Sequence, residues 1–252
     1  MILVVDIGNT HTDIGVFDGD ELYHSTISTH SERTRDEYCV FLREIFNMHK
    51  FKKHIVGAII SSVVPQTTQD MSKAINVLFN VDVIQVEPGI KTGITIKYDN
   101  PKEVGADRIV NAVAAYSEFK TNLIIIDYGT AITFDVVSDK GEYIGGAISP
   151  GISIASEALS EKTAKLPKVP LALPPSIIGK NTIASIQSGL VYGYISMVEG
   201  MIKGIKKEIN DKTIVIATGG QARFFHRCIP SVDHLRPHLT LYGLKILYEK
   251  NR

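Results

Sequence analysis

The chain of 252 residues lacks the features that mark several classes of protein. It has no tryptophan, two cysteines, and 27 basic residues against 27 acidic ones. Cys39 and Cys228 lie in different halves of the chain and form no C-x-x-C motif, as is usual for a protein of a reducing compartment. The balanced charge offers no basic surface of the kind that binds nucleic acid. We expect a protein of the reducing cytoplasm with no nucleic-acid partner.

Long hydrophobic runs and the common nucleotide-binding motifs are missing as well. No window approaches the ~18 uninterrupted apolar residues of a membrane-spanning helix. The apolar start of the chain, residues 1–5, has no basic region before it and ends at Asp6, so a signal peptide is not predicted either. We therefore expect no association with membranes. In addition, no G-x-x-x-x-G-K-[ST] occurs and no two glycines are spaced G-x-G, which excludes the P-loop and the Rossmann fingerprint.

What the chain does contain is a strand-and-turn motif that occurs twice. Residues 2–10 read Ile-Leu-Val-Val-Asp-Ile-Gly-Asn-Thr, and residues 124–131 read Ile-Ile-Ile-Asp-Tyr-Gly-Thr-Ala. Each is an apolar run typical of a buried strand, followed by an acid and a glycine turn with a hydroxyl. Such a turn suits phosphate, and the acid suits a cation beside the phosphate. A single copy is better interpreted as an ordinary β-turn, but two matching copies favour a phosphate site.

The similarity between the two halves extends past the turn. Asp6 and Asp127 are 121 residues apart, close to half of the chain, and each is followed by two more strands joined by a hairpin turn. Helices predicted at 36–50, 67–80 and 109–119 alternate with strands at 54–64 and 81–86. A long helix over 182–209, a strand at 214–217 and a closing helix at 239–248 follow. We predict two α/β domains, residues 1–115 and 116–252, with the ligand between them.

A second candidate site is the segment Gly105-Ala106-Asp107-Arg108, which opens the predicted helix ending at residue 119. Asp107 could accept the proton of a hydroxyl that receives a phosphoryl group, and Arg108 could hold a substrate carboxylate by paired hydrogen bonds. The alternative is an acid that complements the helix dipole beside a surface arginine. His234 and His238 have i,i+4 spacing, but Pro237 makes a regular helix and hence a metal pair improbable.

Over essentially its full length the sequence resembles the type III pantothenate kinases. The matching pieces are Asp6–Asp13, Ser62–Pro65, Tyr98–Pro101, Gly105–Ala115, Asp127–Ala131, Gly145–Gly151, Gly179–Thr182 and Thr218–Gly220. The resemblance implies a duplicated ribonuclease-H-like, actin-like α/β fold. It also implies transfer of the γ-phosphate of ATP to the 4′-hydroxyl of pantothenate, the first step of coenzyme A biosynthesis, by a homodimer.

The resemblance also implies roles for individual residues. Asp107 would be the catalytic base, and Asp127 would hold a monovalent cation, K⁺ or NH₄⁺, while Mg²⁺ accompanies ATP. The residues that would bind ATP are Asp6, Ile7, Gly8, Asn9, Thr10, His11, Thr12, Asp13 and Thr130. Those that would line the pantothenate site are Tyr98, Gly105, Ala106, Asp107, Arg108 and Thr182. The chain departs from the family in having Ile132 where a threonine is usual, which puts a hydroxyl role at that position in doubt.

Two other functions remain open at this stage. Proteins with this fold include accessory factors that act on gene expression, but a non-catalytic copy is expected to have lost Asp107 or one of the acids Asp6 and Asp127, and this chain keeps all three. A kinase of the same superfamily acting on a sugar or a carboxylate is compatible with the fold. The Gly-Ala-Asp-Arg segment weighs against it.

Overall fold

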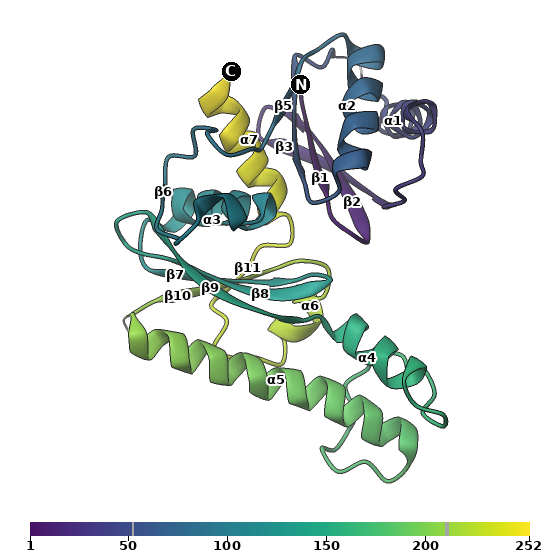
Figure 1. Cartoon of the computed structure of the whole chain (residues 1–252), viewed down its shortest axis with the longest axis vertical. Helices are drawn as coiled ribbons and strands as arrows, with labels where there is room; N and C mark the ends of the chain where they lie inside the picture. The colour runs from purple at the N-terminus through teal and green to yellow at the C-terminus, as the bar shows by residue number, and fades with distance from the viewer. Residues whose placement is uncertain (52, 210–211) are drawn as a thin grey trace. The chain divides into compact units, whose positions relative to one another are not determined.

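The computed structural model describes residues 1–51, 53–209 and 212–252, and it divides the chain into two compact units (Figure 1). The first unit comprises Met1–Phe119 together with His238–Arg252, and the second comprises Lys120–Pro237. No helix among the described residues is both long enough and apolar enough to cross a membrane.

The first unit is built on a five-stranded sheet in the order β3-β2-β1-β4-β5. Its strands are β1 (Ile2–Ile7), β2 (His11–Asp18), β3 (Glu21–Ser28), β4 (Gly57–Ser62) and β5 (Val83–Gln85). The first three form an antiparallel meander, whereas β4 and β5 run parallel to β1. Parallel strands need crossover connections, and the helices between them supply these.

Two of those helices, α1 (Arg35–His49) and α2 (Pro65–Phe79), cover one face of this sheet (Figure 1). Alternate residues of β1, namely Leu3, Val5 and Ile7, form a buried core with residues such as Leu42 and Met71 of these helices. The sequence predicts a strand that continues to residue 64, but Pro65 is the first residue of α2, and β4 ends earlier. Proline fits the first helical turn because its missing N–H would have no intrahelical partner there.

The opposite face carries α3 (Ala106–Phe119) and the C-terminal helix α7 (Leu239–Asn251), which pack against each other. Glycines allow close contact: Gly243 of α7 lies against the Val110 carbonyl of α3, and Gly57 of β4 lies under the Tyr248 ring. A short strand β6 (Thr95–Ile96) and the 3₁₀ turn η1 (Pro101–Glu103) precede α3. The C-terminal helix thus belongs to the first unit, although the sequence analysis placed it in the second domain, because a helix's apolar face does not reveal which sheet it packs on.

The second unit repeats the topology of the first. Its strands are β7 (Leu123–Tyr128), β8 (Ala131–Val137), β9 (Glu142–Pro150), β10 (Ile214–Thr218) and β11 (His234–Leu235). They lie in the order β11-β10-β7-β8-β9, with β7, β8 and β9 antiparallel and β10 and β11 parallel to β7. This corresponds strand for strand to the first sheet and confirms the predicted duplication of an α/β fold with mixed sheets.

Three helices complete the second unit: α4 (Ile152–Glu161), α5 (Thr182–Glu208) and the short α6 (Ala222–His226). The long helix α5 runs along one face of the second sheet (Figure 1) and buries Val198 and Ile202 against Ile124, Ile126 and Phe134. Ile125 and Asp127 alternate with the core residues along β7 and therefore point to the other face, because successive residues of a strand alternate.

The close contact at Gly57 makes a specific prediction about stability. In Gly57→Ala the new methyl group would overlap the Tyr248 ring, and overpacking of this kind typically costs about 1–3 kcal/mol. We expect chemical denaturation to show that loss in the wild-type background and a much smaller loss in a Tyr248→Leu background, where the ring is gone. Equal losses in both backgrounds would contradict the assigned contact.

Candidate functional site

The first strand-end turn lies between β1 and β2. The N–H of Gly8 donates to the carbonyl of His11 at 3.0 Å, and the Thr29 N–H donates to the Thr10 carbonyl at 2.9 Å, so the turn is held at both ends. Asn9, Thr10 and His11 are exposed. The turn therefore presents polar side chains and backbone to solvent in the manner of an anion-binding loop.

Strand alternation sorts the predicted ATP-binding residues of this segment into two groups. Ile7 is buried in the core beneath α1 and α2. Thr12, in register with Ile7, is also buried, and its hydroxyl shares a hydrogen bond of 2.8 Å with that of Thr29. These two residues can offer only their backbone to a ligand, whereas Asp6 and Asp13 project on the opposite face, the one that carries α3 and α7.

On that face the sheet register aligns four polar residues, which we call the polar row: Ser61, Asp6, Asp13 and Thr26. Asp6 of β1 is in register with Ser61 of β4 on one side and with Asp13 of β2 on the other, and Asp13 is in register with Thr26 of β3. Residues in register on neighbouring strands project to the same face. Two carboxylates therefore stand side by side at the base of the turn, one on each of the strands that it joins.

Asp13 is held by its neighbours on β3. Its Oδ1 lies 2.8 Å from Nε2 of His24 and accepts a 2.6 Å hydrogen bond from Thr26. The His24 ring in turn packs against that of His238, with ring centroids 4.5 Å apart and the ring planes tilted by 50°. Burial would raise the pKa of Asp13, but the hydrogen bonds from His24 and Thr26 outweigh it, and the pKa lies below its usual value. Asp13 is thus ionised at neutral pH.

The N-terminal turn of α3 positions Asp107 and Arg108. The Asp107 carboxylate accepts a 2.8 Å hydrogen bond from the Arg108 N–H and folds back over Gly105, where any side chain would collide with it. Asp107 is half-buried, and Arg108 is 7% exposed. A carboxylate fixed at a helix N-terminus can accept a proton. The buried guanidinium beside it can bind an anionic group. Ala106 is the first residue of the helix and is also half-buried.

The second strand-end turn, between β7 and β8, has equivalent hydrogen bonds. Gly129 N–H donates to the Ala131 carbonyl at 3.1 Å, and the exposed Thr130 accepts the Gly151 N–H on its carbonyl at 3.0 Å. Gly219, which has a φ of +91°, passes so close to Asp127 Oδ1 that a Cβ at this position would collide with the carboxylate and with the backbone of Tyr128. A carboxylate with glycine turns packed beside it suits a cation ligand, because the neighbouring backbone can add carbonyl oxygens.

The unusual Ile132 lies on the core face of the second sheet and is buried. Its neighbour Thr133 is in register with Asp127 and donates to Asp135 Oδ2 at 2.9 Å, while Tyr143 donates to Asp135 Oδ1 at 2.7 Å. The departure from the family pattern therefore adds to the core beneath α5. The hydroxyl that accompanies Asp127 on its own face, that of Thr133, is present.

Two predicted pantothenate-site residues lie outside these turns. Tyr98 follows β6 and is half-buried. Thr182 is exposed at the first position of α5, after Asn181, whose side chain caps the helix by accepting the Ala184 N–H at 2.9 Å. Because α5 covers the face of the second sheet opposite Asp127, the fold of this unit does not group Thr182 with Asp127.

Sequence reasoning did not identify Ser61, His24 or Thr26. A polar pair, Ser61-Ser62, at the end of the apolar β4 run is a usable signal for the first of these. His24 and Thr26 lie in a strand with little hydrophobic pattern, and nothing in the sequence alone pairs them with Asp13.

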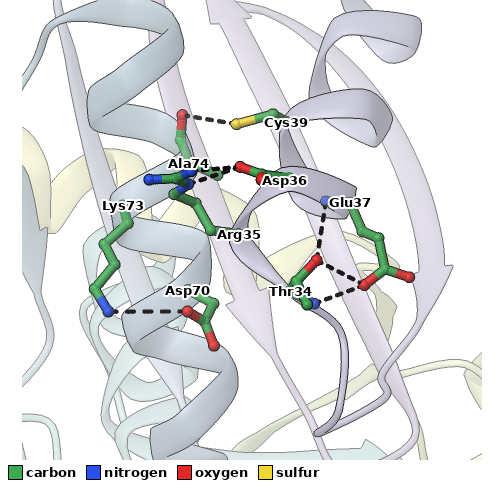
Figure 2. A network of polar contacts seen from close by, with 8 residues as sticks. All are labelled: Thr34, Arg35, Asp36, Glu37, Cys39, Asp70, Lys73 and Ala74. Carbon is green, nitrogen blue, oxygen red and sulfur yellow. Dashed lines mark hydrogen bonds and ion pairs between the residues drawn. The ribbon is translucent and has the colours of Figure 1, made fainter.

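A cavity of about 470 Å³ lies at the start of α1 and is lined by residues 31–36 together with Gln66, Asp70 and Lys73. Its lining holds three acidic and three basic side chains. Two ion pairs lie among them: Arg35 contacts Asp36 at 2.7 Å, and Lys73 lies 3.9 Å from Asp70 (Figure 2). The α1 N-terminus is already capped by the reciprocal bonds of Thr34 and Glu37 (Figure 2). With acidic and basic side chains in equal number and its helix end satisfied, this cavity does not fit a phosphate site.

Other solved structures share this fold. A Campylobacter jejuni protein assigned to the Baf family of transcriptional activators aligns over 99% of this chain and 98% of its own, with a TM-score of 0.61 and 20% identity. The activator of 2-hydroxyisocaproyl-CoA dehydratase from Clostridium difficile, with bound ADPNP, aligns over 98% and 93%, with a TM-score of 0.53 and 13% identity. Such low identities establish the fold alone, and they confirm the ribonuclease-H-like, actin-like class.

Sequence comparison is more specific. The family model described as type III pantothenate kinase matches residues 2–204. The type III pantothenate kinase of Syntrophobacter fumaroxidans is 49% identical over 100% of this chain and 99% of its own length. That of Moorella thermoacetica is 46% identical over 100% of both chains. The chain belongs to the type III pantothenate kinase family.

Proposed function

We propose that this protein transfers the γ-phosphate of ATP to the 4′-hydroxyl of pantothenate and so performs the first step of coenzyme A biosynthesis. The observation that carries the proposal is the pair of acid-and-glycine turns at Asp6 and Asp127, which end equivalent strands of two units with the same strand order. Membership in the family identifies pantothenate as the substrate. The Gly105–Arg108 segment contains groups suited to the hydroxyl and the carboxylate of pantothenate.

The two turns would hold the triphosphate. Residues 6–13 would contribute through Asp6, Asp13 and the exposed part of the turn, with Ile7 and Thr12 using their backbone, and Thr130 would contribute from the second turn. Among the described residues no group of three or more His, Cys, Asp or Glu side chains could hold a metal. Mg²⁺ at Asp6 is compatible with this, since Mg²⁺ usually binds through one or two carboxylates, phosphate oxygens and water.

Asp127 would hold K⁺ or NH₄⁺. The glycine turn at Gly219 brings backbone close to its carboxylate, and a weakly hydrated monovalent cation loses water to a carboxylate and carbonyls more easily than Mg²⁺ does. The cation would offset the repulsion between Asp127 and the triphosphate.

The start of α3 would bind pantothenate. Asp107 would accept the hydroxyl proton, and the buried Arg108 would bind the carboxylate, with Gly105 and Ala106 forming the backbone of this turn. Tyr98 and Thr182 would complete the site.

We also propose that the enzyme is a cytoplasmic homodimer. Gly189, Gly193, Gly200 and Gly204 recur on one side of α5, and a Cβ at any of them would meet nothing within 4 Å, so a second helix could approach closely. The connector before α5 leaves large apolar side chains exposed, including Ile178 at 75%. Exposed apolar groups of this kind favour a second copy of the chain. Cys39 and Cys228 are free thiols, as suits a reducing compartment.

The activity is tested by a coupled assay of ADP release from ATP, Mg²⁺ and K⁺. We expect release to depend on pantothenate and to be absent when a sugar or acetate replaces it. Release that a sugar supports equally well would favour a different kinase of the superfamily, and no acceptor-dependent release would contradict the proposal.

Asp107→Asn is expected to fold normally and to lose ~10² to 10⁴ in kcat, because the amide keeps the shape but cannot accept the proton. The same ADP assay measures kcat, and a thermal melt checks the fold. The matched control is Glu118→Gln, which neutralises an exposed acid at the other end of α3 and should leave kcat unchanged. A variant at Asp107 with near-normal kcat would show that another group is the base.

Activity should be low in Na⁺, rise in K⁺ or NH₄⁺ at matched ionic strength, and respond mainly through the affinity for ATP. Asp127→Asn should remove this response and leave pantothenate binding, measured by calorimetry without nucleotide, nearly unchanged. The control Asp139→Asn changes an exposed acid in the hairpin turn of the same unit and should retain the K⁺ response. If wild-type activity is equal in Na⁺ and K⁺, Asp127 does not hold a functional cation.

A further inference from the structure

The polar row contains a buried hydroxyl that makes no hydrogen bond. Ser61 is 0% exposed, and its Oγ has no hydrogen-bond partner. It occupies the next-to-last position of β4 and is in register with Asp6 of β1. Ser61 therefore sits on the face and at the strand end where the proposed site begins.

An unpartnered buried hydroxyl weakens a fold, since it has lost its hydrogen bonds to water and gained none. The other such hydroxyls among the described residues of the first unit, those of Tyr38, Thr67 and Ser72, lie on α1 and α2, which cover the opposite face of the sheet. Ser61 differs from them because the neighbouring in-register residue is a carboxylate of the proposed site. Its hydroxyl is thus available to a ligand that Asp6 also contacts.

The strand register shows what Ser61 still lacks. Side chains in register on neighbouring strands can bond directly, as Thr26 does to Asp13 at 2.6 Å, but Ser61 Oγ makes no such bond to Asp6. On its other side, Asp6 adjoins Asp13, whose Oδ1 is already bonded to His24 and Thr26. Ser61 is therefore the member of the polar row whose hydroxyl can still donate a hydrogen bond.

We propose that Ser61 Oγ hydrogen-bonds a water molecule of the hydrated Mg²⁺ that accompanies ATP at Asp6. Mg²⁺ gives up its water reluctantly and usually keeps several of its water ligands in protein sites. Groups that hold metal-bound water typically change metal affinity or activity by about 10- to 100-fold when they are removed. The inference rests on the proposed function, because it takes Mg·ATP as the ligand of this turn.

Ser61→Ala tests the assignment with two readouts that should move in opposite directions. Loss of an unsatisfied hydroxyl should raise the melting temperature of the ligand-free protein by about 2–4 °C. The dissociation constant for Mg·ATP, measured by calorimetry without pantothenate, should rise about tenfold. The dissociation constant for ATP in EDTA should stay the same, because no Mg²⁺-bound water is present.

Thr67→Val is the matched control. It removes an equally orphaned hydroxyl from a side chain that is 1% exposed, and it should raise the melting temperature without changing the affinity for Mg·ATP. A fall in melting temperature for Ser61→Ala would show that the hydroxyl makes a structural bond, and an unchanged Mg·ATP affinity would show that it does not serve the metal. Either result overturns the inference alone, provided that the wild type binds Mg·ATP; if it does not, the proposed function fails as well.

Discussion

The position of β1 between β2 and β4, with its apolar side chains buried, is the constraint on which the proposed site in the first unit depends. Leu3, Val5 and Ile7 are buried beneath α1 and α2, and burial of this set fixes the register of the strand. A slip of one residue would turn every side chain to the other face. Asp6 and its neighbours in the polar row project to one common face because the apolar residues that alternate with them along the strands are buried in the core.

The duplicated turns differ in chemistry although their topology is the same. In the first unit the residue opposite the strand-end acid is a second acid, Asp13, and in the second unit it is Thr133. The first turn has three residues between strands and the second has two. One unit thus pairs two carboxylates, and the other pairs a carboxylate with a hydroxyl. This difference is the structural basis for proposing different ions at the two turns, a divalent one at the first and a monovalent one at the second.

The duplicated fold could be predicted because both halves begin with the same local sequence pattern: an apolar run, an acid, a glycine turn and a hairpin. The helices α1, α3 and α5 could be predicted from their periodicity. The position of α7 could not, because its contacts at Gly57 and Val110 involve residues more than a hundred positions away. For the same reason the partners of Asp13, and the alignment of Ser61 with Asp6, become visible only once the strand register is known.

The return of α7 to the first unit has a consequence for synthesis of the chain. Residues 120–237 interrupt the first unit and form the second one. While the ribosome is still making this insert, the side of the first sheet that carries Gly57 and the polar row lacks one of its two covering helices. Because domains tend to fold in the order in which they emerge, the second unit can fold before the first is complete. The face of β1 and β4 that bears Asp6 and Ser61 receives its second covering helix only after residues 238–252 have emerged.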